Sequence, residues 1–194
     1  MKLYHGTNQD FEEFSQDKAR LINDYYGGGV AYFTDNFDVA ETYAKSMARS
    51  KGGSLYVFEI FLDIKKLFDV KDEFSGPMLT RFFDSKKDIE EFARGAGLLK
   101  YGVDKNKILA SLELGNMNLT GEQVFNGLSA GMNKTARARS KLKKLGYDTL
   151  RYDGGKNMNA AIKHNVYITY YSNRIHINSK YHFDSFGNKY KKAD

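Results

Sequence analysis

The sequence predicts an α+β fold, and the order of its hydrophobic patterns is the main reason. Strand-like runs come first, helical patterns fill the middle, and strand-like runs return near the end. A doubly wound parallel sheet would instead alternate strands and helices throughout. With 194 residues, of which 41% are hydrophobic and 14% aromatic, the chain is long enough to bury a real core. We predict a single domain over 1–194 with a mostly helical insert over about 72–144.

The first half of the chain predicts strands around one helix. Leu3 to His5 forms a short strand that ends at Gly6, and Val30 to Thr34 forms a second strand. Asn36 is typical of an N-cap, so we expect a helix over about 36–50. Its apolar stripe has helical spacing and comprises Val39, Ala40, Tyr43, Ala44 and Met47. A longer strand over 54–63 alternates apolar and polar positions.

The second half predicts short helices followed by strands. An amphipathic pattern indicates one helix near 89–96, and Thr120 with Gln123 forms a capping box that opens another. A strongly basic helix over 133–145 ends at Gly146, a typical C-terminal glycine. Two further strands are expected over 147–152 and 165–171, joined by a flexible loop that begins at Asp153.

Composition excludes several classes of protein. The chain has no cysteine, which excludes disulfides, thiolate zinc sites and cysteine nucleophiles. It shows neither a signal peptide nor an apolar run of about 18 residues, so we expect a soluble, cytoplasmic protein without membrane contact. Residues 1–133 carry a net charge of −4 and residues 134–194 carry +10. The basic part is interpreted either as a solvated helix face or as a surface for phosphates.

Three features in order carry the candidate chemistry. They are Tyr4-His5-Gly6-Thr7, then Gly29 to Asp35 with Tyr32 in its middle, then Tyr43. Tyr32 and Tyr43 are 11 residues apart, so a helix can fold the second ring back over the strand that carries the first. A flat heteroaromatic cation could stack between two such rings. His5 could bind a ribose hydroxyl, and the main chain of Gly6 could bind a carboxamide.

This pattern resembles the diphtheria-toxin and poly(ADP-ribose) polymerase branch of ADP-ribosyltransferases, closest to small bacterial or phage toxin and effector domains. The resemblance implies a split antiparallel β-sheet with inserted helices, with NAD+ as co-substrate and no metal. It implies that His5 binds ribose, that Gly6 holds the nicotinamide amide, and that Tyr32 and Tyr43 enclose the ring. Ala40 stands where many members have a serine. The implied NAD-binding set is His5, Gly6, Thr7, Tyr32, Phe33, Ala40 and Tyr43.

The run Val166-Tyr167-Ile168-Thr169-Tyr170 resembles the last catalytic strand of that family, with one departure. The catalytic glutamate of the family would fall on Val166, beside Asn165. Three interpretations stay open: a transferase of the glutamate-lacking kind, a substitute residue, or a fold that only binds NAD. The substitutes are Asp153, Asn165 and Glu122, and the implied catalytic set is His5, Tyr32, Tyr43, Asp153 and Asn165.

The resulting hypothesis is a mono-ADP-ribosyltransferase that modifies a macromolecular acceptor. The basic last third favours RNA or DNA slightly over protein, and the loop over 153–164 falls where relatives recognise their target. The family resemblance implies a role as a toxin, in toxin–antitoxin or phage defence systems, or as a phage effector, with an antitoxin or immunity protein as partner. The alternatives are a non-catalytic NAD- or partner-binding module and an NAD glycohydrolase.

Overall fold

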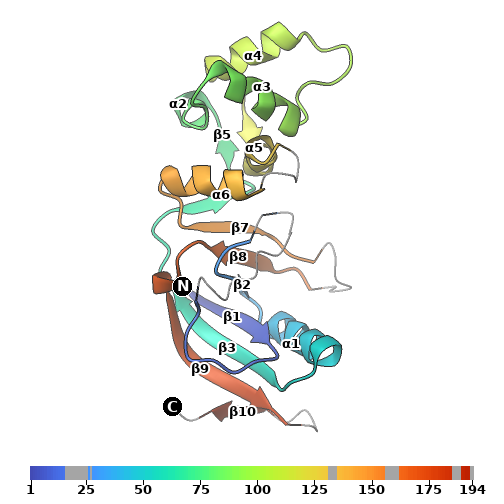
Figure 1. Ribbon diagram of the computed structural model, residues 1–194, viewed down its shortest axis with the longest axis vertical. Helices are drawn as coiled ribbons and strands as arrows, with labels where there is room; N and C mark the ends of the chain where they lie inside the picture. Colours follow the sequence, from blue (N-terminus) through green and yellow to red (C-terminus); the bar gives the residue numbers. More distant parts are fainter. Residues whose placement is uncertain (16–25, 27, 131–134, 156–161, 185–188, 193–194) are drawn as a thin grey trace. The chain divides into compact units, whose positions relative to one another are not determined.

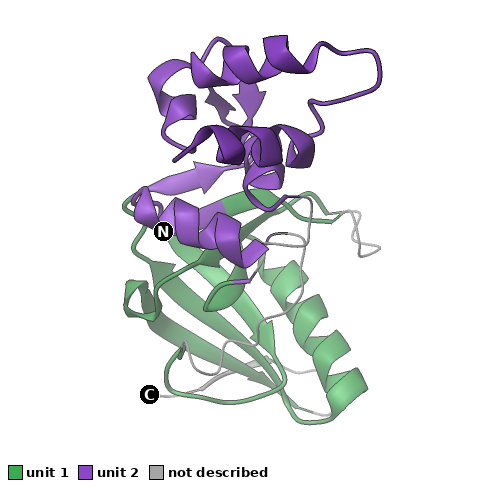
Figure 2. Ribbon diagram, turned by 45° about the horizontal axis from the view of Figure 1, so that its top comes forward, with its two compact units in different colours: residues 1–20, 29–65, 151–194 green, residues 21–28, 66–150 purple. Residues whose placement is uncertain are grey.

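A computed structural model describes residues 1–15, 26, 28–130, 135–155, 162–184 and 189–192 (Figure 1). The chain divides into two compact units, which Figure 2 shows in different colours. Unit 1 comprises Met1–Arg20, Gly29–Lys65 and Arg151–Asp194, and unit 2 comprises Leu21–Gly28 and Lys66–Leu150. The prediction of a single domain with an insert over about 72–144 stays a prediction.

Unit 1 is built on a sheet, and the α+β fold expected from the sequence is confirmed. In the order β10-β9-β3-β1-β2-β8-β7, the neighbouring strands are hydrogen-bonded, and the pairs with a printed register are antiparallel. The strands are β1 (Lys2–Thr7), β2 (Ala31–Thr34), β3 (Leu55–Leu62), β7 (Thr149–Asp153), β8 (Asn165–Thr169), β9 (Ile175–Phe183) and β10 (Lys189–Lys192). The first two residues of β7 belong to unit 2, and a 3-10 turn, Ser172–Arg174, precedes β9.

Helix α1 (Phe37–Lys51) covers one face of β1 and β3 (Figure 1). Its N-cap is Asn36, as expected, whose side chain accepts a hydrogen bond from the Val39 amide at 3.1 Å. The predicted apolar stripe is only partly buried: Val39, Ala40 and Ala44 lie in the core, but Tyr43 is 44% exposed. Tyr43 is therefore not a core residue, because the helix turns it to the edge of the contact with the sheet.

The two faces of the sheet have different covers. Because paired residues of antiparallel strands project from the same face, Tyr4, Gly6, Tyr32 and Val166 share the face that α1 covers. His5, Phe33 and Phe58 project from the opposite face. There they meet Phe11 and Phe14, from the segment that follows β1.

Unit 2 consists mainly of short helices. They are α2 (Gly76–Thr80), α3 (Lys86–Gly95), α4 (Lys105–Glu113), α5 (Gly121–Leu128) and α6 (Thr135–Lys144). Its strands are β4 (Leu67–Asp69), β5 (Glu73–Phe74) and β6 (Leu119–Thr120). The capping box expected at Thr120 and Gln123 is present at the start of α5. Within the described residues, no helix combines the length and the hydropathy needed to span a membrane.

The position of α1 depends on the absence of a side chain at Gly6. A Cβ there would lie 1.8 Å from the Ala40 carbonyl oxygen and 2.9 Å from the Ala44 nitrogen. Both contacts are backbone atoms of a regular helix, so no side-chain rotation can relieve them. Gly6 is therefore required for the helix to lie on β1 at this distance.

We expect Gly6→Ala to lower the free energy of unfolding by more than about 3 kcal/mol, because the overlap exceeds that of ordinary overpacked cores. The matched control is Gly52→Ala, where φ is 71° and nothing lies within 4 Å of the added Cβ. That change adds only backbone strain, about 1–2 kcal/mol. Urea unfolding of both variants measures the difference, and equal losses would contradict the packing argument.

Candidate active site

Strands β1 and β2 join at one point and then part. β1 pairs with β3 along its whole length, from Lys2 to Thr7, whereas its ladder pair with β2 is Tyr4 with Thr34. β2 in turn pairs with β8 at all four of its residues. The sheet of unit 1 thus consists of two halves that meet at Tyr4 and Thr34. Continued in register, Gly6 would face Tyr32, and the ladder is absent there.

The side chain of His5 bridges the two halves where the ladder ends. Its Nδ1 lies 2.8 Å from the carbonyl oxygen of Tyr32. A carbonyl oxygen can only accept, so Nδ1 carries the proton, and in the neutral ring Nε2 is an acceptor. The sequence-based hypothesis that His5 binds a ribose hydroxyl thereby gains a direction, because the hydroxyl would donate to Nε2.

Aromatic rings surround His5 on its face of the sheet. The ring centroids of Phe14, Phe33, Phe11 and Phe58 lie 5.2, 5.8, 6.3 and 6.4 Å from that of the histidine. Burial lowers the pKa of His5, and the hydrogen bond to the Tyr32 carbonyl opposes that shift only in part. The imidazole is therefore neutral at physiological pH. A neutral ring suits a positioning and accepting role beside a cationic nicotinamide, because it adds no repulsion.

The segment with Phe11 and Phe14 was not expected from the sequence. Phe11 stacks on Phe58 with centroids 4.4 Å apart, and Phe14 meets Phe33 edge-on at 5.3 Å. The nearly buried Lys180 holds this segment through Glu12 at 2.6 Å and Asp10 at 3.5 Å. Two phenylalanines three residues apart in a polar stretch were the available signal.

The turn of α1 from Ala40 to Ala44 lies directly on Gly6, and Tyr43 belongs to that turn. Tyr32 is half-buried on β2, and its carbonyl holds His5. The structure therefore brings four sequence-predicted elements into one neighbourhood of unit 1: His5, Gly6, Tyr32 and the helical turn with Ala40 and Tyr43. The exposed ring of Tyr43 removes the ordinary explanation that this tyrosine is only part of the core.

Two other predicted binding residues have structural roles. The Thr7 hydroxyl accepts a hydrogen bond from the Gln9 amide at 3.3 Å, which stabilises the turn after β1. Phe33 is 1% exposed and packs against His5 and Phe14. It can thus act on a ligand only through the side chains that it supports, and its direct contact with NAD stays a prediction.

The predicted replacements for the missing glutamate lie in different places. Asn165 donates hydrogen bonds from its backbone and side-chain nitrogens to the Asp35 carboxylate, at 2.9 and 2.6 Å. Its alternation with Val166 puts it on the face opposite Tyr32. Asp153 is exposed at the end of β7, and Glu122 belongs to unit 2. Asp35, which sequence reasoning did not single out, is thus the group that holds the start of β8.

The position of the family glutamate is apolar in this chain. Val166 is 9% exposed and pairs with Thr34, in line with the junction at Tyr4. Among the residues described here, no group of three or more histidine, aspartate or glutamate side chains could hold a metal ion. Any charge stabilisation at the C1′ carbon of ribose therefore has to come from a source other than residue 166.

Salt bridges engage much of the basic helix that the sequence singled out. In unit 2, Arg137 of α6 contacts Asp88 at 2.8 Å and also Glu91, and Lys141 contacts Asp84 at 2.6 Å. Lys141 and its neighbours hold the pKa of Asp84 below its usual value. Much of the positive charge of α6 thus faces carboxylates of α3 and the segment before it. Residues 133 and 134, and 156–161 of the target-facing loop, lie outside the described residues.

Comparison with protein families gives this neighbourhood its class. Residues 1–180 match the family described as ADP-ribosyltransferase in polyvalent proteins, and the chain belongs to this family. The match includes all strands and helices from β1 to α6, together with β7, β8 and most of β9. No curated protein and no solved structure matches the chain. The expected resemblance to ADP-ribosyltransferases is thereby confirmed, whereas the particular branch stays a prediction.

The lowered pKa of His5 predicts a pH-dependent stability. The unfolded chain binds a proton at the ordinary pKa of 6.5 more tightly than the folded chain does. Stability is therefore complete above that pH and falls as the pH drops below it, by up to about 1.4 kcal/mol per pH unit. His5→Asn, which keeps a donor but does not titrate, should reduce this slope. Urea unfolding between pH 7.5 and 5.0 measures it, and identical slopes in both proteins would refute the assignment.

Proposed function

We propose that this chain transfers a single ADP-ribose from NAD+ to a macromolecular acceptor, with nucleic acid favoured over protein. The observation that carries the proposal is the placement of the exposed Tyr43 on the helical turn that lies on Gly6, next to His5 and Tyr32. Membership of the ADP-ribosyltransferase family supports the reaction class. The proposed role as a toxin, defence protein or phage effector, with a neutralising partner, rests on the resemblance alone.

In this proposal the chain holds the leaving group and orients the ribose. Tyr43 and Tyr32 enclose the cationic nicotinamide ring, through stacking and cation–π attraction. His5 accepts a ribose hydroxyl at Nε2, as its tautomer requires. The bond between C1′ of ribose and the ring nitrogen breaks, and nicotinamide leaves with the electron pair. C1′ then bonds to the acceptor nucleophile, which releases its proton, so positioning and exclusion of water supply most of the catalysis.

The valine at position 166 favours catalysis of the glutamate-lacking kind. A carboxylate near C1′ would stabilise the positive transition state electrostatically. With Val166 buried there, a polar or acidic group of the acceptor is the remaining source close to the reacting bond. Such an enzyme would transfer one unit and would not elongate a chain, because each transfer depends on the acceptor that supplies this group.

A second candidate is a module that binds NAD without reaction, and Val166 is the observation that favours it. Calorimetry separates the two candidates. A transferase binds NAD+ and releases nicotinamide when its acceptor is present, whereas a binding module shows binding heat with no nicotinamide release. An NAD glycohydrolase would release nicotinamide without any acceptor.

We expect Tyr32→Ala and Tyr43→Ala each to lower labelling of lysate from biotinylated NAD+ about 10- to 100-fold. Loss of stacking and cation–π attraction in a partly desolvated site is worth about 1–3 kcal/mol, and each 1.4 kcal/mol is tenfold. The matched control is Tyr101→Ala, because Tyr101 is fully exposed in unit 2.

Equal labelling by the wild type and Tyr32→Ala, or labelling by neither, would refute the enzyme hypothesis. Separate digestion of the labelled lysate with nuclease and with protease identifies the acceptor class. Loss of the label with protease alone would overturn the preference for nucleic acid.

A further inference from the structure

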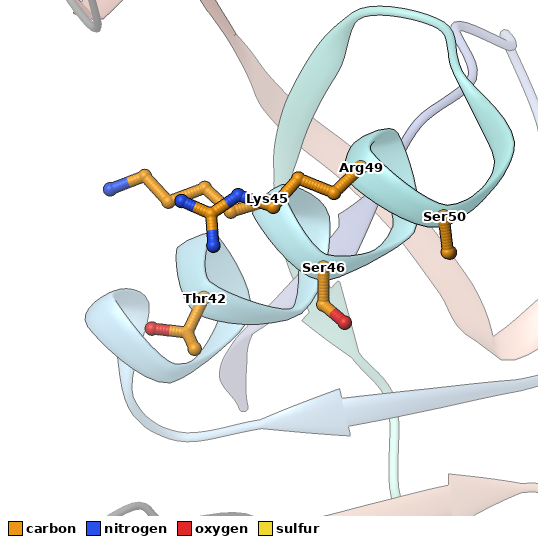
Figure 3. A pocket seen from close by; sticks show the side chains of 5 residues that line it. All are labelled: Thr42, Lys45, Ser46, Arg49 and Ser50. Carbon is orange, nitrogen blue, oxygen red and sulfur yellow. The ribbon is translucent and has the colours of Figure 1, made fainter.

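The outer face of α1 carries a polar surface that the proposed reaction has not used. A pocket on this face is lined by five side chains of the helix: Thr42, Lys45, Ser46, Arg49 and Ser50 (Figure 3). Their spacing places them along one stripe of the helix, about 12 Å long at 1.5 Å per residue. Figure 3 shows the side chains of Lys45 and Arg49 extended in the same direction from successive turns.

The charge of this stripe is not balanced within the stripe. Lys45 forms an ion pair with Glu41, one turn earlier in α1. Arg49 forms no hydrogen bond or ion pair with any residue that the structure describes. The contrast with α6 is direct, because Arg137 and Lys141 of that helix are each bound to carboxylates. The cationic surface expected from the sequence at 133–145 is therefore better developed on α1.

The chemistry of the lining selects one kind of occupant. Three hydroxyls alternate with two cations, and none of the five lining side chains is apolar. A protein partner would need apolar or aromatic anchors at the centre of its contact. Arginine, lysine, serine and threonine are the side chains that contact phosphate oxygens of nucleic acids, without reading the sequence.

We propose that the outer face of α1 binds the phosphate backbone of a single-stranded nucleic acid, which is the acceptor of the reaction. Thr42 adjoins Tyr43 in the helix, so a strand that runs along this face passes beside the proposed nicotinamide site. The inference rests on the proposed function and names the acceptor class for that same site.

Fluorescence anisotropy with a labelled 12-nucleotide RNA, and with DNA of the same length, tests the proposal in the full chain. We expect wild-type binding in the micromolar range, with affinity that falls as salt rises from 50 to 200 mM. Lys45→Ala combined with Arg49→Ala should weaken binding at least tenfold. The slope of log affinity against log salt should decrease by about 1.4, which is 0.7 for each lost phosphate contact of a single strand.

The matched control combines Lys87→Ala with Lys100→Ala, which removes the same charge from exposed positions of unit 2. Equal weakening in both double variants would show an effect of net charge and overturn the proposal. Absence of wild-type binding, or displacement of the strand by NAD+ through the α1 stripe, would also overturn it.

Nicotinamide release from NAD+ distinguishes a failure of this inference from a failure of the proposed function. The α1 double variant should bind NAD+ as the wild type does, because neither cation belongs to the nicotinamide site. If the wild type releases nicotinamide but binds no strand, only the inference fails. If the wild type never releases nicotinamide with any acceptor, the proposed function fails, whatever the anisotropy shows.

Discussion

The contact of α1 with β1 at Gly6 is the constraint on which the rest of the site depends. The helix backbone approaches the strand so closely that a single Cβ would meet the Ala40 carbonyl oxygen. This approach buries Ala40 and Ala44 and turns the intervening Tyr43 outward. The same glycine thus explains why a tyrosine on an apolar stripe is exposed, and why the residue at position 40 is small.

The junction of the two half-sheets is the second constraint. β1 and β2 share the pair Tyr4 and Thr34, and His5 then spans the two strands through the Tyr32 carbonyl. A side chain thus replaces the ladder where the strands part. The phenylalanines around His5 keep its ring neutral, so the junction does not repel a cationic ring nearby. Structural and proposed chemical roles of His5 are therefore linked rather than alternative.

Much of the fold could be read from local patterns. The strands near Leu3, Tyr32 and Phe58, the helix capped by Asn36 and the capping box at Thr120 depend on alternation and capping chemistry, which are short-range. Strand β9 was not expected, although its residues alternate from Ile175 to Phe183, because its polar positions resemble a solvated tail. It forms only by pairing with β3, over 100 residues earlier, and local patterns do not report such pairing.

The sequence by itself determined the class of the protein and the candidate residues, because family membership resides in His5, Gly6, Tyr32 and Tyr43 in order and spacing. Only the tertiary structure decided which of them have ligand-facing positions. It turned Tyr43 outward, committed Asn165 to Asp35, and engaged Arg137 and Lys141 with carboxylates of unit 2. The physical reason is that exposure and charge pairing depend on contacts between residues far apart in the chain. A sequence gives the charge of a residue, and its fold decides whether that charge is already balanced.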